Sequence, residues 1–351
     1  MFARVRSAAV MGVDAYIVEV ETDLEYRLPS LTTVGLAEGA VKESKERITS
    51  AIKNSGFTFP QKKVTINLAP ADIRKEGSGF DFPMAIGILA ADGCIPLQVL
   101  DKYVLLGELS LDGALRHVRG ILPISMAVKD AGYEGIVVPA EDADEAALVE
   151  HLNVYPVAHL KQAVEFLSGS ITIEKHACPD IQKLMKQTSD DVDFSDVKGQ
   201  AHVKRAVEIA AAGSHNILMI GPPGSGKTML ARRIPGILPE MTLLEALETT
   251  KVHSVAGILP NANPLVSHRP FRDPHHSISR VALIGGGLYP KPGEVSMAHN
   301  GVLFLDELPE LGKKNIESLR QPLEDGAVSI SRAAYAVTFP ASFMLVAAMN
   351  P

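Results

Sequence analysis

Apolar and polar positions recur with two different periods along the first half of the chain, and they predict a mixed α/β unit. Val13–Val20 and Val64–Leu68 alternate like half-buried strands. Gly39–Asn54 has the spacing of an amphipathic helix, and the nearly continuous apolar run Asp81–Ala91 predicts a buried helix. The same patterns predict three further elements: a strand at Val104–Leu109, a helix at Leu122–Ala131 and a buried strand at Gly135–Val138. We therefore expect one domain over residues 1–168.

The second half of the chain shows a different pattern, in which short apolar runs are each followed by polar residues. These runs predict strands at Asn216–Ile220, Gly301–Leu305 and Phe343–Met349. Between the halves, the chain is polar from Ser168 to Asp193 and contains Ser-Gly-Ser, Cys-Pro and Ser-Asp-Asp sequences, so residues 169–193 are predicted to be a linker. We expect a second domain over residues 194–351.

The first of these apolar runs leads directly into the sequence GPPGSGKT at residues 221–228, followed by a helix-forming stretch. This is the spacing of a phosphate-binding loop in its usual strand–loop–helix context. Glycines at 221, 224 and 226 allow the backbone to wrap closely around phosphates, and Lys227 places a positive charge beside them. The predicted nucleotide-binding residues are Gly221, Pro222, Pro223, Gly224, Ser225, Gly226, Lys227, Thr228 and Met229.

Polar side chains also follow the other two predicted strands. Asp306 and Glu307 end the second, and Asn350 ends the third. The carboxyl ends of parallel strands meet at one edge of a sheet, so these residues are predicted to complete an ATP and Mg²⁺ site. We assign Thr228 and Asp306 to the metal, and we assign Lys227, Glu307 and Asn350 to catalysis, with Glu307 acting on the attacking water. Taken singly, Glu307 could instead be a helix-terminal charge, and Asn350 could be part of a turn.

Composition adds limits to this interpretation. The 351 residues are 46% hydrophobic and 21% charged, which is ordinary for a globular protein, and the formal net charge of −7 offers no general attraction to nucleic acid. No signal peptide and no apolar run long enough for a membrane span are evident, and the two cysteines lack metal-site spacing. We expect a cytoplasmic protein without a membrane partner.

From residue 194 onward the order of motifs resembles an AAA+ ATPase, with Asp196–Gln200 similar to the segment near the adenine. Residues 269–310 (RPFRDPHHSISRVALIGGGLYPKPGEVSMAHNGVLFLDELPE) resemble the magnesium-chelatase-like branch, and most closely the ComM/YifB family. This branch inserts a hairpin before the second strand of the site, which Val281–Ile284, a glycine turn and Gly293–Met297 fit. A second hairpin fits Ala327–Thr338.

The amino-terminal domain resembles the proteolytic domain of Lon, through residues 74–91 and 107–132. Two departures matter for activity. Gly79 occupies the position of the nucleophilic serine, with Ser78 one residue short, and Leu122 replaces the lysine that activates it. Since a serine nucleophile needs a base within reach, we expect the fold without the protease. The expected fold class is thus a Lon-protease-like α+β domain followed by a P-loop AAA+ core.

The resemblance implies an ATP-driven motor that forms a homo-oligomeric ring, a hexamer in the full-length protein, and promotes branch migration of DNA during natural transformation. Arg332, near the tip of the second hairpin, is a candidate DNA contact. An ATP-dependent Lon-like protease and a motor for metal insertion into porphyrins are the alternatives. The family continues beyond the position of Asn350 with a fifth strand, an arginine finger and a helical lid, so we expect these 351 residues alone to bind nucleotide weakly.

Several histidines gather around the first inserted hairpin in sequence. His275 and His276 are adjacent, and three others lie nearby, at positions 253, 268 and 299. They could suggest a metal site, but no recognised ligand spacing accompanies them. We expect hydrogen-bonding roles instead. Arg272 and Arg280, which flank the pair, are open to two interpretations: contact with nucleic acid or a neighbouring subunit's nucleotide, or solvated loop charges.

Overall fold

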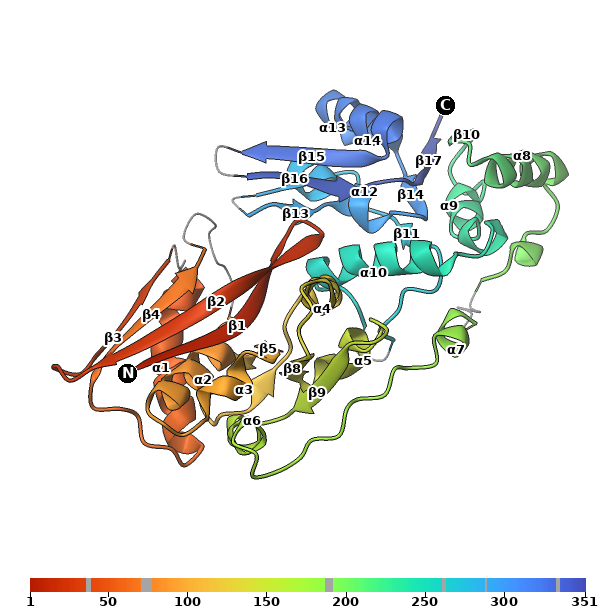
Figure 1. Cartoon of the computed structure of the whole chain (residues 1–351). Helices are drawn as coiled ribbons and strands as arrows, with labels where there is room; N and C mark the ends of the chain where they lie inside the picture. The colour runs from red at the N-terminus through yellow and green to blue at the C-terminus, as the bar shows by residue number, and fades with distance from the viewer. Residues whose placement is uncertain (36–38, 71–77, 187–191, 261–262, 288, 333–334) are drawn as a thin grey trace. The chain divides into compact units, whose positions relative to one another are not determined.

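The structure is a computed structural model that describes residues 1–35, 39–70, 78–186, 192–260, 263–287, 289–332 and 335–351 (Figure 1). The chain forms two compact units, Met1–Pro179 and Asp180–Pro351. Both units are mixed α/β, and the second has an all-parallel central sheet. Each unit is described separately below.

A seven-stranded sheet forms the centre of the first unit. Its order is β3-β4-β2-β1-β5-β8-β9. The β1/β2 and β2/β4 pairs are antiparallel, whereas β3/β4, β1/β5, β5/β8 and β8/β9 are parallel. The strands are β1 (Phe2–Met11), β2 (Asp14–Glu25), β3 (Ser30–Val34), β4 (Lys63–Ala69), β5 (Tyr103–Leu105), β8 (Gly135–Pro139) and β9 (Asn153–Val157), and a small hairpin adds β6 (Glu108–Leu109) and β7 (Leu115–Arg116).

The helices of the first unit build two hydrophobic cores with this sheet. Helices α1 (Gly39–Asn54), α2 (Asp81–Ala91) and α6 (Leu160–Leu167) contribute to one core. Helices α4 (Ile121–Asp130) and α5 (Ala143–Ala146) contribute to the other. A short helix, α3 (Leu97–Leu100), precedes β5. All eleven residues of α2 are buried, which explains why its sequence is apolar on every side.

One charged pair lies inside the first core. Asp81, at the start of α2, is fully buried, and Arg47 of α1 contacts both of its carboxylate oxygens, at 2.7 and 3.2 Å. Burial raises the pKa of Asp81, and the Arg47 guanidinium opposes that rise. Such a pair costs desolvation when it forms and leaves an uncompensated charge when one partner is removed. It therefore fixes how α1 packs on α2.

The second unit is built on four parallel strands in the order β10-β17-β14-β11. These are β10 (Ile217–Ile220), β17 (Met344–Met349), β14 (Val302–Leu305) and β11 (Phe271–Arg272). The main helices are α8 (Ala201–Gly213), α9 (Lys227–Ala231) and α10 (Leu243–Ala256), with a short α7 (Ile181–Met185) before them. Because all four strands run the same way, their carboxyl ends meet at one edge.

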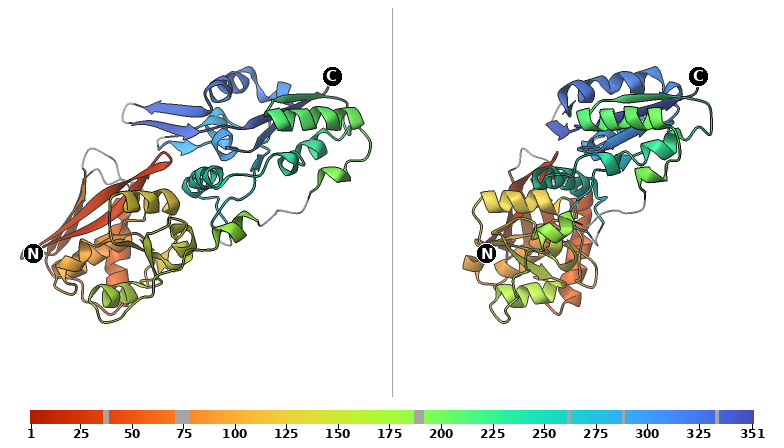
Figure 2. Two further views of the ribbon diagram at one scale, coloured as in Figure 1. Left: turned by 45° about the vertical axis from the view of Figure 1, so that its right-hand side comes forward. Right: turned by 90° about the vertical axis from the view of Figure 1, so that its right-hand side faces the viewer.

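Two insertions interrupt this sheet. The first is α11 (Arg280–Ile284), a hairpin of β12 (Gly285–Gly286) and β13 (Lys291–Pro292), and α12 (Glu294–Met297). The predicted hairpin arms were wrong: Val281–Ile284 is helical, as is most of Gly293–Met297, because the two short strands form between them, at Gly285–Gly286 and Lys291–Pro292. The second is the hairpin of β15 (Ala327–Arg332) and β16 (Tyr335–Pro340), confirmed as predicted, with α13 (Lys313–Ser318) and α14 (Arg320–Asp325) before it (Figures 1 and 2).

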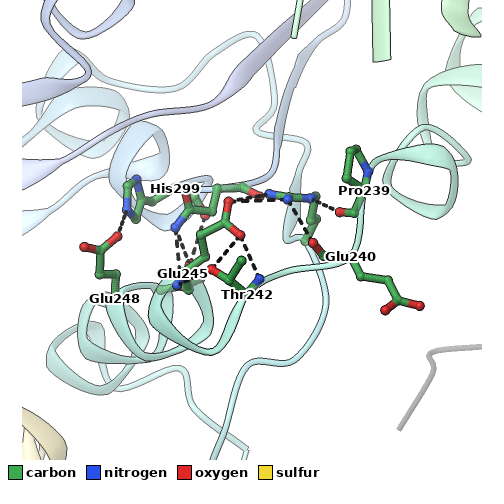
Figure 3. A network of polar contacts seen from close by, with 9 residues as sticks. Pro239, Glu240, Thr242, Glu245, Glu248 and His299 are labelled. Atoms are coloured by element: carbon green, nitrogen blue, oxygen red, sulfur yellow. Dashed lines mark hydrogen bonds and ion pairs between the residues drawn. The ribbon is translucent and has the colours of Figure 1, made fainter. Parts of the chain in front are cut away.

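A polar network closes the opposite, amino-terminal edge of the second sheet (Figure 3). Arg269 donates to the carbonyls of Pro239 and Asn300, at 2.6 and 2.7 Å, and lies 3.4 Å from the carboxylate of Glu245. Glu245 in turn caps α10 by accepting from Thr242. The segments before β11, before β14 and at the start of α10 are thereby joined, which leaves the carboxyl edge for the site.

Candidate nucleotide site

Each strand of the second sheet delivers polar side chains to the carboxyl edge. The loop 221–226 follows β10, Asn350 follows β17, Asp306 and Glu307 follow β14, and residues 273–276 follow β11. Direct contacts join three of these groups. Lys227 Nζ donates to Asn350 Oδ1 at 3.1 Å, and Thr228 Oγ1 donates to Asp306 Oδ2 at 2.9 Å. Residues that are 123 and 78 positions apart in sequence are thus brought together.

The loop itself has the backbone that its glycines predict. Gly224 and Gly226 have φ of 77° and 87°, which L residues with side chains rarely adopt, whereas Gly221 does not lie in this region. Lys227 Nζ also donates to the carbonyls of Gly221 and Pro222, at 2.7 and 3.1 Å. Its ammonium group is therefore held over the loop, between the backbone and Asn350. A single cation placed over such a turn suits a phosphate group.

The hydroxyl and carboxylate beside it offer oxygen ligands. Asp306 accepts from Thr228 on one oxygen and from the backbone N–H of Glu307 on the other, at 2.9 Å each. Mg²⁺ prefers hard oxygen ligands and usually keeps several waters, so a Thr–Asp pair next to a phosphate loop fits it. In the described part of the chain, no group of three His, Cys, Asp or Glu side chains is arranged to hold a metal by itself.

Glu307 is placed by an unusual backbone and by a histidine that the sequence did not assign to it. Its φ is 50°, in the left-handed region, directly after β14. His276 Nδ1 lies 2.8 Å from Glu307 Oε2. The sequence showed His276 only as half of a His-His pair, and nothing in its spacing pointed to a residue 31 positions away. The contact arises because β11 and β14 are neighbours in the sheet.

The segment predicted to lie near the adenine is joined to the loop. Gln200 Nε2 donates to the carbonyl of Ser225 at 3.1 Å. Arg233, just after α9, contacts Asp196 at 3.1 Å and donates to the carbonyl of Asp193 at 2.9 Å. These contacts place residues 193–200 beside the phosphate loop, as a base-binding segment requires.

The remaining cations and histidines have mostly structural partners. Arg272 forms a two-pronged pair with Glu294, at 2.6 and 2.9 Å, so it is not a solvated loop charge, while Arg280 is exposed. His253 contacts the carbonyl of Met297 at 2.9 Å, and His299 accepts from the Ser342 N–H at 3.1 Å. The hydrogen-bonding role expected of these two histidines is confirmed.

The other predicted positions fall at the margins of the described structure. Arg332 ends β15 and pairs through its backbone with Tyr335, at the tip of the hairpin. Its side chain and residues 333–334 lie outside the described part, so the proposed DNA contact stays a prediction. In the first unit, residues 74–77 of the Lon-like segment also lie outside it.

The positions that correspond to the Lon dyad hold no serine–lysine pair. Ser78 contacts the Glu108 carboxylate, and Leu122 is fully buried. A Cβ added at Gly79 would approach Val118 Cγ1 to 3.1 Å, so a side chain there needs Val118 to move. The absence of peptidase activity stays a prediction, and these contacts give it a physical reason.

Three histidines have displaced pKa values. The Asp142 carboxylate raises the pKa of His117 in the first unit, and burial raises the pKa of Asp142 itself. In the second unit, burial lowers the pKa of His253 and of His299. The folded first unit therefore favours the protonated form of His117, whereas the folded second unit favours the neutral forms of His253 and His299.

Comparisons with known proteins match both halves of the chain. A family model described as "Magnesium chelatase, subunit ChlI" matches residues 193–351, and one described as "Subunit ChlI of Mg-chelatase" matches residues 20–142. Competence protein ComM of Haemophilus influenzae is 48% identical, over 99% of this chain and 68% of its own length. Protein YifB of Escherichia coli is 47% identical, over 99% and 67%.

A weaker similarity is to a protease. Lon protease 2 of Bacillus subtilis is 28% identical over 47% of this chain and 33% of its own length.

Within the described residues, no helix has the length and apolar content that crossing a membrane requires.

Proposed function

Because the chain belongs to the ComM/YifB family of magnesium-chelatase-like proteins, we propose that it binds and hydrolyses ATP as an AAA+ motor that acts on DNA. The observation that carries the ATPase part is the junction of three strand ends, where Lys227 meets Asn350 and Thr228 meets Asp306. A phosphate loop alone would support only nucleotide binding. The added carboxylates and amide are the groups that hydrolysis needs.

Each side chain has a separate task in this proposal. Lys227 neutralises phosphate charge, Asn350 orients the γ-phosphate or the attacking water, and Glu307 polarises that water. Thr228 and Asp306 would hold Mg²⁺, which supplies positive charge to the phosphate oxygens when bound. In the present contacts Lys227 donates to two loop carbonyls and to Asn350. A bound phosphate would replace some of these contacts.

The proposed action on DNA is supported by the similarity to ComM and by one structural element. The relative at 48% identity carries the name competence protein, which agrees with action on incoming DNA, and we extend the proposal from there to branch migration. The β15–β16 hairpin ends at Arg332 and could present a cation to a phosphate backbone. We further propose a cytoplasmic ring of identical subunits, hexameric in the full-length protein.

The test is an ATPase assay of the purified protein without DNA and with single-stranded, duplex and branched DNA. We expect Mg²⁺-dependent hydrolysis that branched DNA stimulates, and loss of stimulation in Arg332→Ala with basal turnover retained. Glu307→Gln should bind nucleotide and not turn over. Hydrolysis that no DNA stimulates would contradict the DNA part.

A second candidate is a motor for metal insertion, because the family model that matches residues 193–351 is that of a magnesium chelatase subunit. Stimulation of the ATPase by a porphyrin-binding partner, and not by DNA, would favour it. In the described part of the chain Ser78 contacts the Glu108 carboxylate and not a lysine, which does not favour a Lon-like protease.

A further inference from the structure

His276 contacts the residue that would act on water, although it lies in a different segment of the chain. Its Nδ1 is 2.8 Å from Glu307 Oε2, with the two side chains 35% and 51% exposed. Among the described residues, no other side chain contacts this carboxylate. The pair sits at the carboxyl edge of the sheet, where β14 ends and where the loop after β11 passes.

The turn that carries His276 is fastened on both sides. Before it, Asp273 pairs with Arg232 at 3.2 Å, next to the end of α9. After it, Asn315 Nδ2 donates to the carbonyl of Ile278 at 3.0 Å, and also to that of Leu311 at 3.0 Å. The turn is therefore attached to the segment that follows the phosphate loop and to the segment that follows Glu307.

The turn also has internal contacts that orient its rings. His275 Nδ1 lies 2.8 Å from Ser277 Oγ and accepts from the Ser277 N–H at 3.2 Å. The His275 and His276 rings are 4.0 Å apart, centroid to centroid. The fastened backbone of the turn, rather than the His275 ring, keeps the His276 imidazole within reach of Glu307. A contact with this turn limits the rotamers that the Glu307 side chain adopts.

We propose that His276 is a positioning residue for Glu307, which holds the carboxylate in the orientation that acts on the attacking water. This inference rests on the proposed ATPase function and goes beyond it by naming the side chain that sets the geometry. A general base is commonly oriented by a third group in this way. Nucleotide affinity should not depend on this pair, because His276 would contact Glu307 and not the phosphates.

The first test compares two substitutions at position 276. His276→Ala should lower kcat roughly 10-fold, since a general base as a whole contributes about 10²–10⁴ and orientation is part of that. KM and nucleotide affinity should stay unchanged. His276→Asn keeps an N–H donor close to the place of Nδ1 and should restore most of the rate. A higher kcat in His276→Ala would show that the contact restrains Glu307, and would overturn the proposal.

The second test separates a direct effect from a general disturbance of the turn. In the Glu307→Gln background, His276→Ala should cause no further loss, because its action passes through the carboxylate. His275→Ala is the matched control, since it removes the neighbouring ring and leaves the Glu307 contact; we expect less than about a twofold change for such a substitution. Equal losses in the two single variants would overturn the proposal.

A spectroscopic measurement tests the contact between His276 and Glu307 without ATP turnover. Nitrogen-15 spectra of the histidine rings should show a change at His276 in Glu307→Gln and none at His275. An unchanged His276 signal would overturn the proposal whatever the rates are. If the native protein does not hydrolyse ATP at all, the proposed function fails together with this inference. Normal hydrolysis that His276→Ala leaves untouched rejects this inference alone.

Discussion

At the scale of single residues, Lys227 is the side chain whose removal should affect ATP binding most directly. Lys227→Ala removes a cation that donates three hydrogen bonds within the site. Charge-assisted hydrogen bonds contribute about 1.5–3 kcal/mol each, so we expect nucleotide affinity to fall at least 10-fold. Calorimetric titration with a slowly hydrolysed ATP analogue measures this. Lys227→Arg, which keeps the charge, is the control, and equal affinity in native protein and Lys227→Ala would contradict the assignment.

Arg47 gives a second residue-scale prediction, this time for stability. Arg47→Met removes the cationic partner of the buried Asp81, which keeps its hydrogen bonds with Ser44 and the Leu109 backbone. Because the Arg47 side chain is 26% exposed, we expect a loss of at most about 3 kcal/mol in the first unit, the lower end for a buried pair. Denaturant unfolding followed by hydrogen exchange in α1 and α2 would measure the loss. Arg27→Met is the matched control, because its pair with Glu25 lies on the surface of the same unit. The interpretation fails if both substitutions have the same small effect.

At the scale of elements, the join between β11 and β14 supports the edge where the site lies. A Cβ added at Gly301 would lie 2.1 Å from the carbonyl oxygen of Pro270, and backbone cannot yield as a side chain does. Gly301→Ala should therefore separate β11 from β14, with a loss of about 2 kcal/mol or more for the second unit. Turnover should fall as well, since residues 273–276 follow β11.

Gly236→Ala is the matched control for this prediction. The nearest atom to its added Cβ is 3.8 Å away, and its φ needs no glycine. Thermal unfolding of the two variants should separate them clearly. If Gly301→Ala unfolds at the same temperature as Gly236→Ala, a small backbone shift relieves the close approach of residue 301 to Pro270. The pairing of β11 with β14 then does not depend on a glycine at position 301.

The elements also show how far the sequence alone could lead. The helices at Gly39–Asn54 and Asp81–Ala91 were predicted with the observed ends, because their patterns are long and have clear limits. The strand β1 was missed. Its buried positions are largely filled by small Ala and Ser residues, and Arg4 and Arg6 alternate with them, so the sequence has little apolar contrast.

The candidate site, too, could be predicted only in part. The loop at 221–228 could be proposed as phosphate-binding because its motif is contiguous in sequence. Asp306, Glu307 and Asn350 could be placed at the same edge of the sheet because they follow apolar strands. His276 could not be linked to Glu307. It follows its strand by four residues, and its partner is determined by the sheet order and by the turn that Asn315 fastens. Contacts of this kind depend on tertiary packing, which local patterns do not contain.

At the scale of the whole molecule, the two units should respond to pH in opposite directions. The raised pKa of His117 contributes stability to the first unit that is present below about pH 6.5 and is lost as pH rises through the folded-state pKa. The lowered pKa values of His253 and His299 act the other way. Their contribution is present above about pH 6.5 and is lost as pH falls through the folded-state values.

Hydrogen exchange followed by mass spectrometry, corrected for the intrinsic rate at each pH, can measure the two units within one chain. Between pH 5.5 and 8 we expect His117→Gln to flatten the response of the first unit only, and His253→Gln to flatten that of the second only. Slopes that neither substitution alters would show that other groups control the pH dependence.

The two separate cores of the first unit have a consequence for how this sequence can change over time. One core contains Val5, Ile66 and Phe82, the other contains Val104, Ile124 and Val138, and the two clusters have no residue in common. Side chains that share no contacts lose stability independently when they are shortened. Substitutions in different cores should therefore show little epistasis, while those within one core should constrain each other strongly. A lineage can accordingly repack one core without first adjusting the other, provided that the summed loss stays within the margin of stability.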